Sequence, residues 1–501
     1  MRIFALFVAL SVACQGQQKA AAPRPAVPSA PVQDDKPVVT RHEMTAHGAA
    51  LRYTASTGFL PIKNEMGETE ASMFYIAYTL ETTAPAAKRP LTFAFNGGPG
   101  AASVWLHLGA LGPKRVKMMP DGAMPPAPYE LIPNEQTWLD KTDLVFIDPV
   151  GTGYSRVTKP ELAQKFNGVQ GDISSVGEFI RLYLTRNERW GSPLFLAGES
   201  YGTTRAAGLS GYLIERGVAF NGVVLISTVL NFQTIRFTRG NDLPFVLYLP
   251  SYTATAWYHK KLAPDLQKDL RKTLDEARAW AIGPYAEALA KGVLLKGGER
   301  QAIVAKLARY TGLSEQYVDN ADLRVEILRF CNELLRDRGT TVGRIDSRLI
   351  AYEGRNVAEL PEFDPSIAAI RPPYTALFAD YVRRELGFKT DFTYYVLGGG
   401  IAGWDWGSAA EGFADTADAM RAAVAKNPHM KVFAACGYFD LATPFFAAEY
   451  TLSHMGVDAR LRGNFQTEYY EAGHMMYIHP PSLEKLRRDV GRFLDSAMSG
   501  R

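Results

Sequence analysis

The chain is poor in cysteine. Its 501 residues include only three, and Cys14 lies near the start, which leaves Cys331 and Cys436 for the rest of the chain. Small domains held together by disulfides carry a much larger share of cysteine, so this class of protein is excluded. An exported chain would permit Cys331 and Cys436 to pair, but a core of this size does not need a covalent link. We therefore expect both to be free thiols.

The chain also has almost no excess of positive over negative charge. There are 55 lysines and arginines against 52 aspartates and glutamates, which gives a formal net charge of +3. This balance offers no reason to expect nucleic acid or an anionic membrane as a partner. No run of 18 apolar residues marks a transmembrane span. His-Glu-x-x-His patterns, paired cysteines and a phosphate-binding loop are missing too, so we expect neither a metal nor another cofactor.

What the chain does have is a composition that is 47% hydrophobic, enough for a large core. Its start predicts a signal peptide over residues 1–13, because a short positive segment precedes an apolar stretch too short to cross a bilayer. Small residues at Ser11 and Ala13 suit cleavage. We expect a secreted or periplasmic protein.

Cys14 leaves an alternative open, since a cysteine directly after such a segment is the site of lipid attachment in bacterial lipoproteins. Ser11 stands where a lipoprotein signal has a large aliphatic residue, so plain secretion is favoured over a lipid anchor. Residues 14–45 are predicted to be a flexible tether, because the stretch up to residue 38 is rich in Ala, Pro, Gln and Ser.

Short apolar runs alternate with amphipathic ones over most of the remaining chain. The expected buried strands are Leu91–Phe95, Leu144–Asp148, Leu194–Gly198, Val223–Ser227 and Val432–Cys436. Apolar residues at helical spacing predict a helix around Val176–Leu184 and another around Leu483–Leu494. Such alternation is typical of an α/β fold with a mostly parallel sheet covered on both faces.

The middle of the chain differs, because helical patterns dominate between residues 235 and 425. We therefore predict a core in two parts, 46–234 and 426–499, interrupted by a helical cap over 235–425. The cap is rich in aromatics, which we expect to be mostly core packing. Trp404 and Trp406 follow a run of glycines, and a role in a pocket is the alternative for them.

The strongest local signal is Gly198-Glu199-Ser200-Tyr201-Gly202, which follows a predicted strand and precedes a predicted helix. This is the context of a nucleophile elbow, in which a tight turn presents a serine hydroxyl at the edge of a sheet. A side chain at either glycine would collide with the neighbouring strand or helix. We predict that Ser200 is the nucleophile of an α/β-hydrolase.

A serine hydroxyl needs a base, and the base needs an acid to orient it. His474 is the predicted base, because it follows a glycine on the loop after the last strand-like segment. His479 is the chief rival, and His454 is expected on the surface of a helix. Asp440 follows the preceding strand and fits the role of the acid, although a turn or helix cap is the alternative.

Four motifs, in this order, resemble those of the serine carboxypeptidases. They are Asn96–Gly100, Asp148–Ser155, Gly198–Gly202 and Gly473–Met475. With its export signal, the chain resembles a bacterial exported member of this family. The resemblance implies an α/β-hydrolase fold and an enzyme that releases C-terminal amino acids from peptides through an acyl-enzyme on Ser200.

The resemblance also implies residue roles. The triad would be Ser200, Asp440 and His474, and the backbone amides of Gly98 and Tyr201 would form the oxyanion hole. The terminal carboxylate of a peptide substrate would be bound by Asn96, Gly97 and Glu199, with a proton shared between Glu199 and the substrate.

The chain departs from the family at Ala110, where a second glutamate is common in a Glu-Leu-Gly-Pro stretch. This departure leaves an esterase or acyltransferase on the same scaffold as the alternative. A binding protein that kept the fold is a third hypothesis, but it has no need for the triad and the oxyanion glycines together. The sequence does not predict the oligomeric state.

Overall fold

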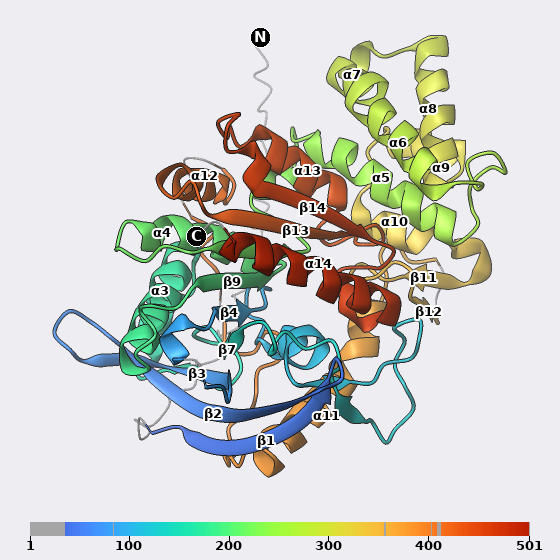
Figure 1. Cartoon of the computed structure of the whole chain (residues 1–501). Coiled ribbons are helices and arrows are strands. Elements are labelled where there is room, and N and C mark those ends of the chain that lie inside the picture. Colours follow the sequence, from blue (N-terminus) through green and yellow to red (C-terminus); the bar gives the residue numbers. More distant parts are fainter. Residues whose placement is uncertain (1–35, 84, 355–356, 402, 408–411, 500–501) are drawn as a thin grey trace, which may run out of the picture.

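The computed structural model describes residues 36–499 apart from residues 84, 355–356, 402 and 408–411. The predicted signal peptide and Cys14 lie outside the described residues. At the centre is a ten-stranded sheet (Figure 1). One of its strands, β8 (Arg156–Val157), pairs only with β3 and lies outside the main strand order. The order of the other strands is β1 (Val38–Ala46), β2 (Ala49–Lys63), β3 (Thr69–Leu80), β7 (Asp143–Ile147), β4 (Leu91–Phe95), β9 (Leu194–Glu199), β10 (Gly222–Ile226), β13 (Lys431–Gly437) and β14 (Phe465–Tyr470).

Strands β7, β4, β9, β10, β13 and β14 run parallel to one another. The five strands predicted from apolar runs are all among them, within one residue at each end. Strands β4, β7 and β10 are buried along their whole length, because helices cover both faces of the sheet and leave no position for a polar side chain to reach water. The predicted α/β-hydrolase core with a mostly parallel sheet is confirmed.

Strands β1, β2 and β3 are antiparallel and were not predicted. The tether predicted for residues 14–45 is wrong at its C-terminal end, because residues 38–45 belong to β1. This strand pairs with β2 along its whole length, and its side chains alternate between more and less exposed positions. Such a half-exposed edge strand carries polar residues at every second position, so it lacks the unbroken apolar run that marks the buried strands.

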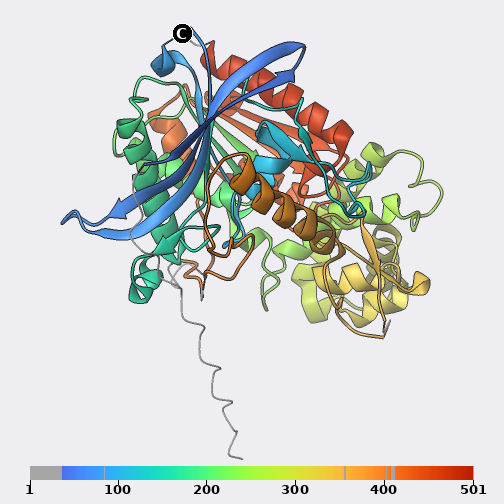
Figure 2. The same cartoon turned by 90° about the horizontal axis from the view of Figure 1, so that it is seen from below.

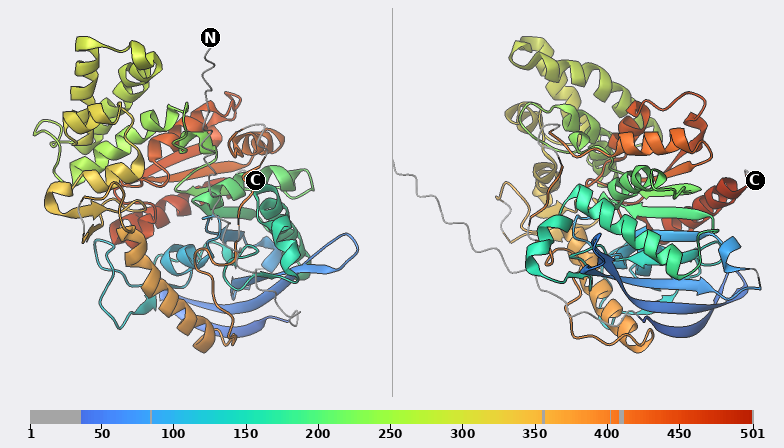
Figure 3. Two further views of the ribbon diagram at one scale, coloured as in Figure 1. Left: turned by 180° about the vertical axis from the view of Figure 1, so that it is seen from behind. Right: turned by 90° about the vertical axis from the view of Figure 1, so that its left-hand side faces the viewer.

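Helices form a layer on each face of the sheet (Figures 2 and 3). One face is covered by α3 (Val169–Arg186), α4 (Tyr201–Ile214) and α12 (Ala417–Lys426). The other is covered by α11 (Pro365–Arg384) and α14 (Pro480–Met498), together with α1 (Val104–Leu106) and the turn of helix that continues it. The helices predicted around residues 176–184 and 483–494 are α3 and α14.

The segment between β10 and β13 is mainly helical and builds a lobe beside the carboxyl end of the sheet (Figure 1). Its helices are α5 (Leu243–Tyr258), α6 (Leu270–Trp280), α7 (Ala286–Lys291), α8 (Gly297–Thr311), α9 (Glu315–Asn320) and α10 (Ile327–Glu333). They share an apolar core with α13 (Phe445–His454). The later helices α11 and α12 instead pack on the sheet, and the cap boundaries at 235 and 425 stay a prediction.

Shorter elements complete the described part of the chain. They are the strand pairs β5 (Lys114–Val116) with β6 (Leu131–Pro133) and β11 (Thr340–Val342) with β12 (Ile350–Tyr352), helix α2 (Ala163–Phe166), and the turns of helix η1 (Ala86–Lys88), η2 (His107–Leu111), η3 (Pro160–Leu162), η4 (Phe232–Thr234), η5 (Ala281–Tyr285), η6 (Gly292–Leu294), η7 (Arg336–Arg338), η8 (Arg462–Asn464) and η9 (Met476–Ile478). None of the described helices combines the length and the apolarity that crossing a membrane requires. Cys331 and Cys436 are buried free thiols, as expected.

Candidate active site

Ser200 occupies the turn between β9 and α4, at the carboxyl end of the parallel strands. Its φ of +60° and ψ of −130° are strained for a residue with a side chain. The turn can be this tight because of the flanking glycines. A Cβ atom on Gly198 would lie 2.2 Å from the carbonyl oxygen of Gly202, and one on Gly202 would lie 2.9 Å from the carbonyl oxygen of Phe95. The local geometry is that of a nucleophile elbow.

His474 and Asp440 lie together on the loops that follow β14 and β13. His474 Nδ1 and Asp440 Oδ2 are 2.7 Å apart, and both side chains are buried. Asp440 Oδ1 accepts hydrogen bonds from the backbone amides of Ala442 and Thr443, so the carboxylate is held from two sides. Since a carboxylate accepts the Nδ1 proton, the other ring nitrogen, Nε2, is left as the base.

The pKa of His474 reflects two opposing effects. Burial disfavours the imidazolium, but the adjacent Asp440 carboxylate stabilises it, and the net pKa lies above the ordinary value for histidine. An imidazole with a raised pKa is suited to accept a proton from a nearby hydroxyl group.

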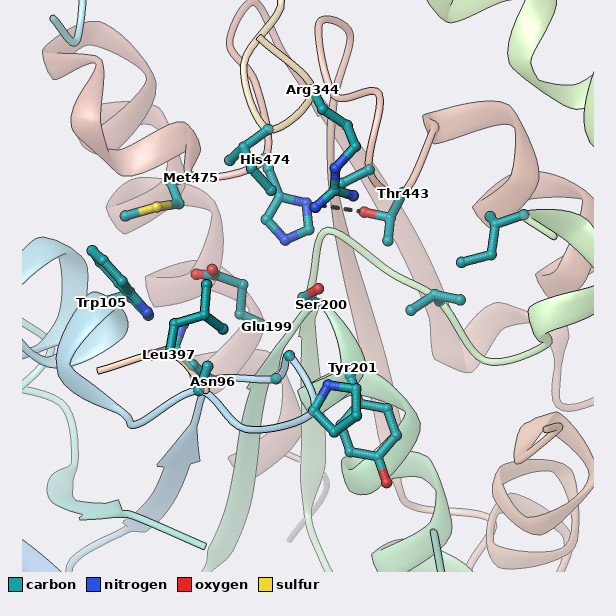
Figure 4. Close-up of a pocket in the computed structure, with 18 of the residues that line it drawn as sticks. Asn96, Trp105, Glu199, Ser200, Tyr201, Arg344, Leu397, Thr443, His474 and Met475 are labelled. Carbon is teal, nitrogen blue, oxygen red and sulfur yellow. Dashed lines mark hydrogen bonds between the residues drawn. The ribbon is translucent and has the colours of Figure 1, made fainter. Parts of the chain in front are cut away.

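Ser200 and His474 line the same cavity, which has a volume of about 480 Å³, and the imidazole lies over the serine (Figure 4). Among the described residues no hydrogen bond joins Ser200 Oγ to the ring, a separation that is common in unliganded hydrolases and closes when substrate binds. His479 is not among the residues that line the cavity. It bonds Ser482 at the start of α14, and His454 is exposed.

Asn96 and Glu199 face the cavity on one side of Ser200 (Figure 4). Asn96 is 1% exposed, and its Oδ1 accepts a hydrogen bond from the backbone amide of Leu106. Its Nδ2 is buried and makes no hydrogen bond of good geometry among the described residues, but it lies near enough to the Glu199 carboxyl to lower the pKa of that group. A buried donor that is poorly satisfied is costly, so this amide is suited to bind an acceptor on a ligand beside Glu199.

Glu199 is 3% exposed, and burial raises the pKa of its carboxyl to about 7. The hydroxyl of Tyr477 donates a hydrogen bond to Glu199 Oε2 over 2.5 Å. Ala110, at the position where the family commonly has a second acid, is buried in η2. In this chain the hydrogen-bond partner of Glu199 is therefore the phenol hydroxyl of Tyr477 and not a second carboxylic acid at position 110. Tyr477 was not predicted, because nothing in its sequence context marks it, and the contact joins residues 278 positions apart.

The loop of Gly97 and Gly98 is pressed against the elbow. A Cβ atom on Gly97 would lie 2.4 Å from the backbone nitrogen of Tyr201. Gly98 has a φ of +100°, which side chains rarely permit. Tyr201 is the first residue of α4, and an amide in the first turn of a helix has no acceptor within the helix. Both Gly98 and Tyr201 line the cavity beside Ser200.

A short segment between β11 and β12, residues 344–347, holds the loops of His474 and Asp440 together and was not predicted. The backbone amide of His474 donates to the carbonyl of Ile345 over 2.7 Å, and that of Gly473 donates to Asp346 Oδ2. Ser347 donates its backbone amide to the carbonyl of Phe439, next to Asp440. The positions of His474 and Asp440 therefore depend on a segment about 100 residues earlier in the chain.

Of the two tryptophans considered for a pocket, Trp406 lines the cavity, whereas Trp404 packs against the ring of Tyr201 at 5.4 Å between centroids. Within the described residues, no cluster of three or more His, Cys, Asp or Glu side chains is arranged to hold a metal.

Residues 47–290 match the protein family described as serine carboxypeptidase. The chain is 26% identical over 212 residues to serine carboxypeptidase-like 36 of Arabidopsis thaliana, a match that covers 40% of each chain. It is 32% identical over 155 residues to the pheromone-processing carboxypeptidase KEX1 of Saccharomyces cerevisiae, which covers 29% of this chain and 20% of that protein. The matched region thus spans less than half of the length of these curated relatives.

A crystal structure of the prohormone-processing carboxypeptidase from Saccharomyces cerevisiae superposes with a TM-score of 0.51 over 88% of this chain and 91% of that one, at 17% identity. At this identity the likeness shows a shared fold. Just under half of the chain, residues 47–290, is therefore similar to the serine carboxypeptidase family, and the chain as a whole has the α/β-hydrolase fold.

Proposed function

We propose that this protein is a serine-type carboxypeptidase that releases C-terminal amino acids from peptides. The observation that carries the proposal is the pair formed by Asn96 and Glu199 beside Ser200. A buried amide donor that makes no hydrogen bond of good geometry and a carboxyl with a pKa of about 7 both face the cavity of the nucleophile. Together they suit the free carboxylate at the end of a peptide chain, because a protonated Glu199 can donate a hydrogen bond to it.

The proposed reaction starts when Ser200 Oγ attacks the last peptide carbonyl and gives its proton to His474 Nε2. The amides of Gly98 and Tyr201 stabilise the oxyanion, and each such donor contributes about 3 kcal/mol in the transition state. His474 then protonates the leaving amine. A water molecule, activated by the same histidine, releases the acyl group from Ser200.

The test compares an N-blocked dipeptide with its C-terminal amide. A carboxypeptidase should cleave the free acid with a kcat/KM at least about 100-fold higher, since only the acid engages Asn96 and Glu199. Equal rates on both would overturn the recognition of the carboxylate. Ala110 favours the second candidate, an esterase or acyltransferase, and cleavage of short aryl esters without any cleavage of peptides would establish it.

The pH dependence of KM should report Glu199. Because its pKa is raised to about 7, Glu199 is neutral below that pH and charged above it. Ionised Glu199 repels the substrate carboxylate, so KM for a peptide acid should rise by about tenfold per pH unit above pH 7. The C-terminal amide of the same peptide should not show this rise. A steady-state pH profile with both substrates measures the difference.

Two variants give the controls for this profile. Glu199→Gln is neutral at every pH and should abolish the rise in KM; a rise that persists in this variant would contradict the assignment. The Tyr477 hydroxyl stabilises the ionised form of Glu199 and so lowers its pKa. Tyr477→Phe should therefore move the rise to a higher pH.

We also propose that residues 1–13 direct export to the periplasm or outside the cell, and that residues 235–425 act as a cap. Support for export is the sequence of the N-terminus, and support for the cap is the lobe of helices between β10 and β13. Mass spectrometry of the N-terminal peptide from the mature protein tests the first point. An acylated Cys14 would show a lipid anchor instead of a freely secreted chain, and a retained Met1 would exclude cleavage.

A further inference from the structure

We propose that Arg236 and Arg344 form a subsite for an acidic side chain on the residue before the scissile bond, so that the preferred substrates carry Asp or Glu at that position. The inference rests on the proposed carboxypeptidase function, because that function sets the direction in which the peptide lies in the cavity.

The direction follows from the two sides of Ser200. In Figure 4, Asn96 and Glu199 lie on one side of the nucleophile, with Trp105 beyond them. Arg344 lies above Ser200, beside the ring of His474, and Thr443 lies above it and to the other side. The leaving residue carries the terminal carboxylate and therefore lies with Asn96 and Glu199. The residue that is transferred to Ser200 must lie away from this pair, where Arg344 borders the cavity.

Arg236 lies near enough to Arg344 for their charges to interact. It lines the cavity, and its guanidinium carbon lies 4.6 Å from the centre of the Trp406 ring and 5.3 Å from that of Phe232. Both rings contact Tyr201, directly after the nucleophile. Stacking on aromatic rings leaves the N–H donors of a guanidinium available for a carboxylate. Phe232 and Trp406 provide an apolar wall for the methylene groups of a glutamate side chain.

The positive charge of the two arginines is poorly balanced within the described residues. Arg236 has no carboxylate within 4.0 Å there, and Arg344 has only Asp364, at 4.0 Å between Nε and Oδ2. Asp364 also accepts hydrogen bonds from the backbone amides of Arg344 and Ser366, which engage its other oxygen. The two cations are close enough to interact, since burial and then Arg344 lower the pKa of Arg236. A substrate carboxylate between them would relieve this repulsion.

The experiment measures kcat/KM for three N-blocked dipeptides that share one leaving residue and have Glu, Gln or Lys before the scissile bond. The wild-type enzyme should prefer Glu over Gln by about tenfold, with Lys the poorest. Arg236→Gln and Arg344→Gln should each bring the ratio of Glu to Gln towards one. Arg239→Gln is the matched control, because this residue of the same segment is exposed, as Arg236 is, but does not line the cavity and should leave the ratio unchanged.

Arg344 also acts on the pKa of His474, so Arg344→Gln could change the rates on all substrates. The ratio of kcat/KM for Glu to that for Gln is independent of such a general effect, because it applies equally to both substrates. A wild-type ratio of one or less, or a ratio that neither variant changes, would overturn the subsite. If no dipeptide is cleaved, the proposed carboxypeptidase function fails, and the same Glu and Gln residues are compared as N-blocked aryl esters. A faster Glu ester that loses its advantage in the variants would then support the subsite, whereas equal rates or no cleavage would overturn it.

Discussion

Replacement of Ser200 by alanine should lower kcat by about 10⁶-fold and leave the fold intact. The reason is that the proposed acyl-enzyme cannot form without Oγ, and His474 alone has no nucleophile to activate. The stability should change little, because alanine at this position has the same strained φ of +60° as the serine. Ser200→Gly is the informative companion. It removes the nucleophile too, but glycine tolerates this backbone, so the variant should gain on the order of 1–3 kcal/mol in the free energy of unfolding.

Labelling by a fluorophosphonate probe measures the first effect independently of the natural substrate. The wild-type protein should react, and both variants should not. Urea denaturation of the three proteins measures the second effect. Labelling that survives in Ser200→Ala would place the nucleophile elsewhere, and no labelling of the wild type would revive the hypothesis of a binding protein.

Replacement of Asp440 by asparagine should lower kcat by about 10⁴-fold through the tautomer of His474. Asp440 Oδ2 accepts from the imidazole, and Oδ1 accepts from two backbone amides. In the variant, the amide oxygen is expected to keep the two backbone donors, and the NH₂ group then faces Nδ1. That nitrogen must become an acceptor, so the ring proton moves to Nε2 and points at Ser200, where it cannot take up the serine proton.

Thr443→Val is the matched control for this prediction. The Thr443 hydroxyl donates to Asp440 Oδ2, at 2.8 Å, and lies 3.2 Å from His474 Nδ1, but its removal leaves the contact between the imidazole and Asp440 in place. Its loss should cost on the order of 10- to 100-fold in kcat, in line with one hydrogen bond to a charged acceptor, and so much less than the loss of the orienting acid. Steady-state kinetics on one substrate compare the three proteins. An Asp440→Asn variant that keeps a tenth of the wild-type kcat would exclude Asp440 as the orienting acid.

Much of the core could be predicted because its signals are local. An unbroken apolar run such as Leu91–Phe95 marks a strand buried on both faces, and the structure has β4 at the same residues. The glycines around Ser200 indicated a tight turn from their spacing alone. The edge strand β1 was not predicted, because it is half exposed and its sequence is therefore as polar as that of a loop.

By itself, the sequence determined the α/β class, the elbow at Ser200, and His474 and Asp440 as candidates for base and acid. Each depends on a few neighbouring residues whose sterics or chemistry admit few alternatives. Only the tertiary structure decided what surrounds them. It brought Tyr477 to Glu199, laid residues 344–347 across the loops of His474 and Asp440, and placed Arg236 and Arg344 near each other in the lining of one cavity. These contacts join segments about 100 to 280 residues apart, and side-chain partners at such separations are set by the packing of the sheet and the cap, which local patterns do not encode.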